Sequence, residues 1–205
     1  MNGAAIGLRA HSGWTAMVAV ALDEGVPWVL WRGRPHLVET FTFEFRQPYH
    51  TAEKVPIGEA RGVIARARDE AARLARNAIA TVLRRAADVD CDLTGCGLLL
   101  ASGRPLPSLE RILASHALIH TADGELFRDA LVAAAKGCGL EMFTIRESEV
   151  VANASRELGM KPDAILRRVA RLGAELGPPW AQDEKLAALA AWMALIHRNV
   201  PAARG

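Results

Sequence analysis

The sequence predicts an α/β fold in which an antiparallel β-meander is followed by β-α-β units. The first observation is a pair of short apolar runs at 4–9 and 15–22, separated by HSGW as in a hairpin. The second is a helical spacing of apolar residues over about 59–86. The third is the continuous apolar run CGLLLASG at 96–103, which is typical of a parallel strand covered on both faces. Together these patterns indicate a mixed sheet with helices on both faces.

The predicted meander continues to about residue 45. The segment DEGVP is expected to turn because Gly and Pro interrupt it, and WVLWRG at 28–33 follows as a third strand. HLVETFTFEF at 36–45 then alternates, with Phe41, Phe43 and Phe45 on one face. Such alternation predicts a strand with one face in solvent, so we assign 1–45 to the β-meander.

The second half of the chain is expected to be mostly helical. A helix over 111–120 has Ser108 as its N-cap, and TADGELF at 121–127 is expected to break or kink it. LEMFTI at 140–145 is predicted to be a strand. Further helices are expected at 147–158, 161–176 and about 182–199, so that 159–200 supplies C-terminal helices. We expect the whole chain, 1–205, to be a single domain.

Composition excludes several classes of protein. Of the 205 residues, 51% are hydrophobic, which is too many for a disordered chain. The formal net charge of +2 neither requires nor excludes nucleic acid. Three cysteines without a CxxC pair argue against a disulfide framework or a zinc ribbon, so we expect a cytoplasmic protein with reduced thiols. No apolar run approaches the roughly 20 residues of a membrane span, and no membrane partner is expected.

Two groups of charged residues can each be interpreted in two ways. The outer face of the 59–86 helix carries basic residues that could line a phosphate track, or could simply be a solvated face. Glu147 and Glu149 follow the strand at 140–145, where open α/β sheets bind ligands, but acids there also favour the first turn of a helix. The basic residues of the long helix are Arg61, Arg68, Arg73, Arg76 and Arg84.

The order of elements is that of the ribonuclease H-like fold, and the chain resembles the RuvC-type Holliday-junction resolvases within it. AIGLRAHSGWTAMVAVAL is similar to the family's first hairpin, and CGLLLASG to its fourth strand. FRDALVAAAKGCGLEMFTIRESEVVANASRELG resembles the helix, fifth strand and segment that follow. KPDAILRRVARLGAEL and DEKLAALAAWMALIH resemble the two closing helices. The resemblance implies a ribonuclease H-like mixed sheet and a dimer formed through a helix.

The same resemblance shows where the catalytic acids are missing. Enzymes of this family hold two Mg²⁺ ions with four carboxylates, and the ions activate water and stabilise the leaving oxygen of a phosphodiester. The central Asp at the end of strand one falls within 9–11 here, where no residue is acidic. The Glu at the end of strand four falls near Ser102, while Asp183 and Glu184 lie near the last two acids. The resemblance therefore implies the fold but argues against the two-metal reaction.

In this fold the HSGW hairpin, the loop after strand four and the final helix meet at one cleft. His11 could act there as a general base near neutral pH, and Arg104 could grip a phosphate or carboxylate. The alternative is that Ser12 and Gly13 form a hairpin turn that His11 merely satisfies. The candidates for this cleft are His11, Asp183 and Glu184 for catalysis and Ser12, Trp14, Ser102 and Arg104 for binding.

Two further segments carry candidate ligands. RQPYH at 46–50 is typical of a binding loop, although a proline-anchored turn explains it too. His116 and His120 are four residues apart on one helix, so their rings could chelate a metal if His11 or His50 supplied a third ligand. The alternative is that these two histidines only cap the helix or pack against their neighbours. The binding candidates of the RQPYH segment are Arg46, Gln47, Tyr49 and His50.

The function ranked first is a binding domain, for nucleic acid or a partner, that lacks two-metal nuclease activity. One alternative is a diverged metal-dependent phosphodiester or phosphoester hydrolase with a rebuilt site containing His11. Another is an oligomeric scaffold, a homodimer, with exposed tryptophans forming its contact. We expect no cofactor for the binding domain and a divalent metal for the hydrolase. The tryptophans are Trp14, Trp28, Trp31 and Trp180.

Overall fold

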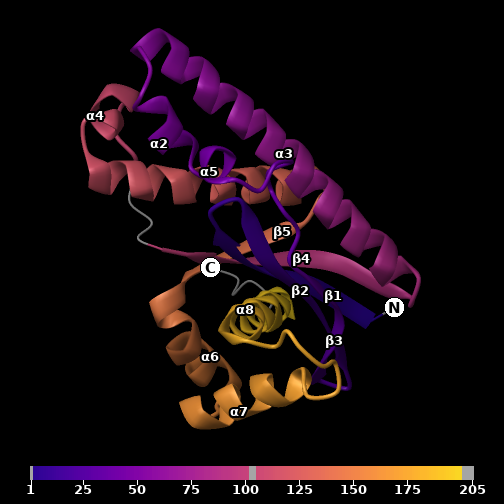
Figure 1. Ribbon diagram of the computed structural model, residues 1–205. Helices are drawn as coiled ribbons and strands as arrows, with labels where there is room; N and C mark the ends of the chain where they lie inside the picture. The colour runs from indigo at the N-terminus through magenta and orange to yellow at the C-terminus, as the bar shows by residue number, and fades with distance from the viewer. Residues whose placement is uncertain (1, 102–104, 200–205) are drawn as a thin grey trace, which may run out of the picture.

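The computed structural model describes residues 2–101 and 105–199, and its elements form three layers (Figure 1). A five-stranded sheet in the order β3-β2-β1-β4-β5 lies between two groups of helices. The first three strands pair in antiparallel fashion, whereas β4 pairs in parallel with both β1 and β5. The predicted mixed sheet with helices on both faces is confirmed. The strands are β1 (Asn2–His11), β2 (Trp14–Asp23), β3 (Val26–Gly33), β4 (Cys91–Leu100) and β5 (Glu141–Arg146).

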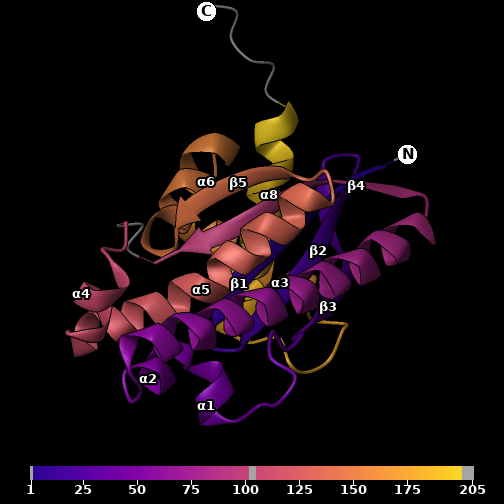
Figure 2. The same ribbon diagram turned by 90° about the horizontal axis from the view of Figure 1, so that it is seen from above.

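The helices divide between the two faces of the sheet (Figures 1 and 2). One face is covered by the long α3 (Ile57–Ala87) and α5 (His116–Gly137), joined by the short α1 (Phe43–Arg46), α2 (Pro48–Ala52) and α4 (Leu109–Leu113). The other is covered by α8 (Gln182–Asn199), with α6 (Val150–Leu158) and α7 (Pro162–Leu172) outside it and the 3-10 turn η1 (Glu147–Glu149) before α6. Within the described ranges, every helix is too short or too polar to cross a membrane.

The alternation of β1 determines which residues reach which layer. Successive side chains of a strand point to opposite faces. Ile6 and Leu8 pack in the core formed with α3 and α5, and Ala5 packs in the core formed with α8. The odd-numbered face leads on to Arg9 and His11, so both of these polar side chains emerge on the α8 side of the sheet, at the end of β1.

The predicted strand at 36–45 is wrong, and the meander assigned to 1–45 ends earlier, at Gly33. His36 makes one isolated bridge to Trp14, and the short helix α1 begins at Phe43. Phe41 stacks on His36 with ring centroids 4.1 Å apart, while Phe43 meets the edge of another ring, that of His50. The alternating aromatics thus make separate local contacts and do not share one face of a sheet.

The predicted break at 121–127 is also wrong, because α5 runs through this segment without interruption. The break lies earlier, between α4 and α5 at Ala114 and Ser115. Leu126 and Phe127 are buried against the core, and their packing outweighs the cost of about 1 kcal/mol of a glycine within a helix. The TADG sequence is therefore a turn signal that tertiary contacts override.

Candidate functional site

Four polar side chains meet where β1, β5 and α8 come together; we call Arg9, His11, Glu147 and Asp183 the Arg9 cluster. The guanidinium of Arg9 donates two hydrogen bonds to Glu147, from Nε and Nη2, each 2.8 Å long. It also donates from Nη1 to Oδ1 of Asp183. His11 Nε2 lies 2.9 Å from the same Asp183 oxygen. A single cationic side chain thus joins the end of β5 to the start of α8.

The hairpin between β1 and β2 positions His11. Ser12 and Gly13 form a two-residue loop, and Gly13 adopts a φ of +82°, a conformation that glycine adopts without strain. His11 therefore pairs directly with Trp14 across the hairpin, and their rings stack at 4.2 Å. The turn interpretation describes the backbone of HSGW, but the His11 side chain is also in contact with Asp183.

Glu184 is buried and has a helix-capping contact. Its side chain is only 1% exposed, and one of its carboxylate oxygens accepts a hydrogen bond from the backbone N–H of Ala181, one residue before α8. This is the contact of a capping box, in which the third helical residue reaches back to the N-cap. Arg34 donates two hydrogen bonds to the same carboxylate, at 2.6 and 3.1 Å.

Ion pairs and burial both shift the pKa values of the Arg9 cluster. The hydrogen bonds from Arg9 lower the pKa of Glu147 despite its burial. Burial opposes ionisation of Asp183, but His11 and Arg9 outweigh it and its pKa is lowered. Burial and the nearby charge of Arg9 lower the pKa of His11, although Asp183 and Glu147 act in the opposite direction. Because His11 is then neutral at neutral pH, the positive charges next to Asp183 are those of Arg9 and Arg34.

We expect His11 to make the free energy of unfolding depend on pH just below neutrality. The unfolded histidine takes up a proton near pH 6.5. The folded one resists protonation because of burial, so stability is complete above that pH and declines as the pH falls toward the lower folded pKa. His11 is 30% exposed, so the decline is expected to stay below about 1 kcal/mol.

Urea unfolding at pH 7.5 and pH 5.5 measures this effect. His11→Gln should lose the decline between the two pH values, while His36→Gln, at an exposed position, should keep it. An unchanged pH dependence in His11→Gln would show that other groups cause it.

The RQPYH segment is folded into helices rather than an open loop. Tyr49 is 2% exposed, and its hydroxyl accepts a hydrogen bond from Arg68. Arg46 donates to the backbone carbonyl of Ser12, and Gln47 precedes α2. The segment is therefore not a loop, and although Tyr49 and His50 are buried, its part in binding stays a prediction. Ser102 and Arg104 lie outside the described residues.

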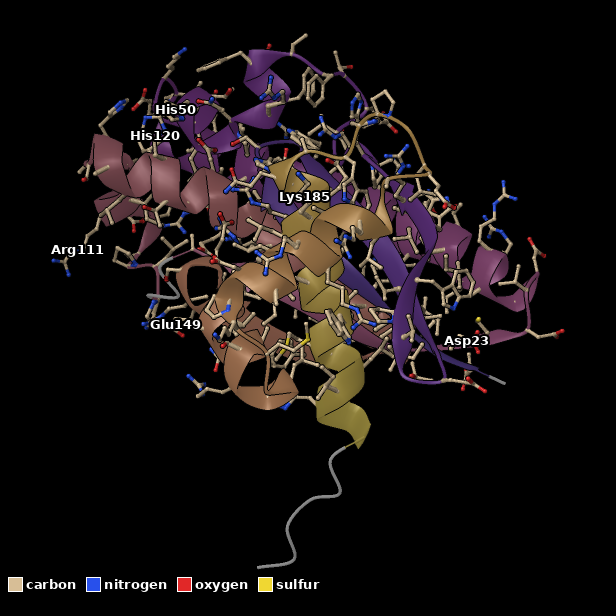
Figure 3. The ribbon with its side chains drawn as sticks, turned by 90° about the horizontal axis from the view of Figure 1, so that it is seen from below. Asp23, His50, Arg111, His120, Glu149 and Lys185 are labelled. Atoms are coloured by element: carbon tan, nitrogen blue, oxygen red, sulfur yellow. The ribbon has the colours of Figure 1, made fainter. Side chains whose placement is uncertain are left out.

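The structure brings three of the predicted ligands together at a second place, and we call His50, His116 and His120 the histidine cluster. One ring nitrogen from each lies within 4.8 Å of the others, and Figure 3 shows His50 and His120 side by side. His11 contacts Asp183 and Trp14 instead. The sequence suggests either His11 or His50 as the third ligand. The structure places His50, and not His11, beside His116 and His120.

A hollow of about 620 Å³ lies between α3, α4 and α5. Its lining includes Tyr49, Arg61, Arg68 and Glu125. It is thus on the face of the sheet opposite α8, apart from the Arg9 cluster. Among the described residues, the Arg9 cluster of paired side chains lies where a cleft was expected, at the carboxyl end of β1.

Comparison with known proteins identifies the fold. No protein-family model matches the sequence, and neither does any curated protein. The structure of Thermus thermophilus RuvC matches at 10% identity with a TM-score of 0.53, over 96% of this chain and 95% of that one. T. thermophilus RuvC in complex with a Holliday junction substrate matches at 9% identity with a TM-score of 0.56, over 96% and 94%. This chain has the RuvC-like, ribonuclease H-like fold. The resemblance predicted from the sequence is confirmed for the fold.

The two Mg²⁺ ions that the RuvC-like fold implies do not fit the side chains of the Arg9 cluster. Arg9 stands at the end of the first strand, where the resemblance places the central carboxylate. Both oxygens of Glu147 accept hydrogen bonds from Arg9, and Asp183 Oδ2 lies 3.7 Å from Arg34. A divalent ion would need free carboxylate oxygens and would here face fixed positive charge.

Sequence reasoning does not find every residue of this arrangement. Glu147 has the pattern of a first-turn acid as well as that of a ligand, and nothing in the sequence singles out Arg34. Arg9 is visible from the sequence only as a position without an acid, although a basic residue there is itself a signal, because a cation can replace a metal between two acids. Asp123, which contacts His50, gives no signal beyond its helical position.

Proposed function

We propose that this chain is a nucleic-acid-binding domain in which ion pairs replace the two-metal nuclease site of the RuvC-like fold. The observation that carries this proposal is the Arg9 guanidinium, which bonds to Glu147 and Asp183 together. A guanidinium balances these carboxylates as a metal ion would, but it cannot activate water as a Lewis acid. The acids are therefore structural partners, and the domain retains binding without phosphodiester hydrolysis.

The basic stripe of α3 is the surface that we propose contacts phosphates. The helix carries seven arginines and three acidic residues. Arg66, Arg73 and Arg84 are exposed and recur at a spacing that places them on one side, opposite the buried Ile64, Ala71 and Val82. At 1.5 Å per residue, the stripe from Arg66 to Arg84 is about 27 Å long. That length spans several phosphates of a duplex.

The likeness to RuvC supports nucleic acid as the class of partner. T. thermophilus RuvC has been solved in complex with a Holliday junction substrate. Next to the Arg9 cluster, the Arg34 guanidinium lies 5.1 Å from the ring centre of Trp14. Combinations of arginine and aromatic side chains are common where proteins bind nucleic-acid strands.

The alternatives receive less support from the geometry. A hydrolase rebuilt around His11 would have Asp183 beside it, but Arg9 pairs with that carboxylate and Arg34 pairs with Glu184. The other histidine candidates lie apart, in the histidine cluster. A scaffold held together by tryptophans would need an exposed aromatic face. Trp28 and Trp31 pack against one core and Trp14 and Trp180 against the other, and all four are half-buried.

Binding and cleavage of fluorescent DNA test the proposal. With the full chain, a four-way junction and a matched duplex are expected to bind with an affinity that falls as salt rises, because phosphate contacts release counterions. Addition of Mg²⁺ or Mn²⁺ should produce no cleavage. Arg66→Ala with Arg84→Ala should weaken binding about tenfold and make the salt dependence shallower by about two units.

A matched pair of arginines on the other face of the sheet provides the control. Arg167 and Arg171 are exposed on α7, and their double replacement by alanine changes the net charge equally. That variant should bind DNA as the unmodified chain does. Metal-dependent cleavage that disappears in Asp183→Ala would contradict the loss of activity. Absence of binding, or weakening only in the α7 variant, would contradict the proposed surface.

A further inference from the structure

The histidine cluster has the composition and spacing of a transition-metal site. His116 and His120 lie one turn apart on α5, and their Nε2 atoms are 3.1 Å apart. Two nitrogens bound to one tetrahedral zinc, each about 2.0–2.1 Å from the ion, lie about 3.3 Å from each other. His50 comes from α2 and completes the set, with its ring centroid 4.5 Å from that of His120. Three of the six histidines of the chain thus gather at one place.

A buried carboxylate orients His50. Asp123 is 2% exposed and accepts a hydrogen bond of 2.7 Å from the backbone N–H of Tyr49. Its second oxygen lies 2.5 Å from Nδ1 of His50. A carboxylate can only accept, so Nδ1 carries the proton and the lone pair of Nε2 is directed to the other side of the ring. Metal-binding histidines commonly have this carboxylate partner, which fixes the tautomer and ring orientation.

One side of the histidine cluster is open to solvent. His50 is buried, whereas His116 and His120 are exposed. Hydrophobic packing therefore does not account for the two helical histidines, whose rings meet edge to face at 4.5 Å in contact with solvent. Three imidazoles on one side and solvent on the other form the donor set of a three-histidine site with an open fourth position.

We propose that His50, His116 and His120 bind one divalent transition-metal ion of the zinc class. Imidazole ligands favour Zn²⁺, Co²⁺, Ni²⁺ or Cu²⁺ over Mg²⁺ or Ca²⁺, which prefer oxygen. The ion links α2 to α5, two helices whose ligands are 66 and 70 residues apart in sequence. This site is separate from the Arg9 cluster, so it neither requires nor restores two-metal nuclease chemistry.

Cobalt and zinc titration of the untagged, metal-free full chain tests this site. Co²⁺ is expected to bind at one equivalent with the visible absorption bands of a tetrahedral complex, and Zn²⁺ should displace it. Zn²⁺ should also raise the Tm, because it binds only the folded arrangement. His116→Ala and, separately, His120→Ala are expected to weaken Zn²⁺ binding by at least about 100-fold, since loss of an outer partner alone costs about 10–100-fold.

His197→Ala is the matched control, because His197 is an exposed histidine on α8 paired with Glu157. It should bind Co²⁺ and Zn²⁺ as the unmodified chain does. Both cluster variants change exposed side chains, and circular dichroism without metal will show whether they fold. Failure of the unmodified chain to bind one equivalent, or equal binding by His116→Ala, His120→Ala and His197→Ala, would overturn the proposal.

Discussion

Replacement of Arg9 by alanine is expected to destabilise the folded chain by about 1–3 kcal/mol and to create a binding site for Mg²⁺. Removal of one partner from a buried ion pair costs about 3–5 kcal/mol, because the remaining charge is left without compensation. The Arg9 and Glu147 side chains are 21% and 37% exposed, so water screens part of this cost. Without the guanidinium, Glu147 and Asp183 would face each other as two carboxylates. Such a pair of hard oxygen ligands suits Mg²⁺.

Urea unfolding with and without Mg²⁺ measures both effects. Mg²⁺ should raise the stability of Arg9→Ala and leave the unmodified chain unchanged; histidine ligands do not favour this ion, so the histidine cluster should not interfere. Arg146→Ala removes an exposed arginine that pairs with Glu149 and should change stability by less than about 0.5 kcal/mol. Equal responses to Mg²⁺ in the unmodified chain and Arg9→Ala would show that Arg9 does not occupy the place of a cation.

The fold could be predicted from the sequence because apolar residues repeat with a characteristic period within each strand and helix. The long apolar repeat of α3 and the uninterrupted run of β4 each depend on neighbours within one element. α3 covers its predicted range, whereas β4 overlaps the predicted run at 96–103 but begins at Cys91 and ends at Leu100. The segment at 36–45 shows the limit of this reasoning. Alternation there has the period of a strand, but whether a strand forms depends on a partner that the segment does not find.

The candidate site could be predicted only in part, because its contacts join distant residues. Arg9 and Glu147 are 138 positions apart, and no local pattern pairs them. The i,i+4 spacing of His116 and His120 could be read from one helix, whereas Asp123 acquires its contact with His50 only after α2 packs on α5. Glu184 shows a further ambiguity, since an acid at the third helical position suits a cap as well as a metal.

Gly7→Ala is expected to cost about 3 kcal/mol or more, a large effect for the addition of a single methyl group. Gly7 lies on the face of β1 that contacts α8, and a Cβ atom there would overlap the backbone carbonyl of Ala187 and lie 2.7 Å from the backbone nitrogen of Ala191. Backbone atoms within a helix cannot move aside individually, so α8 would have to shift as a whole. Urea unfolding of Gly7→Ala measures the cost. Gly3→Ala on the same strand is the control, because no atom lies within 4 Å of its Cβ position.

The same close approach sets the distance between Arg9 and Asp183. Gly97 on β4 would also bring a Cβ into the backbone of α8, at Ala190, so two glycines on neighbouring strands let the helix lie against the sheet. Asp183 is in the first turn of that helix, and Arg9 is two residues beyond Gly7 on the same face of β1. A displaced α8 would carry Asp183 away from the guanidinium. In a double-mutant cycle, Arg9→Ala should therefore cost less in the Gly7→Ala background than in the unmodified chain. Additive costs would mean that the ion pair forms independently of how α8 is seated.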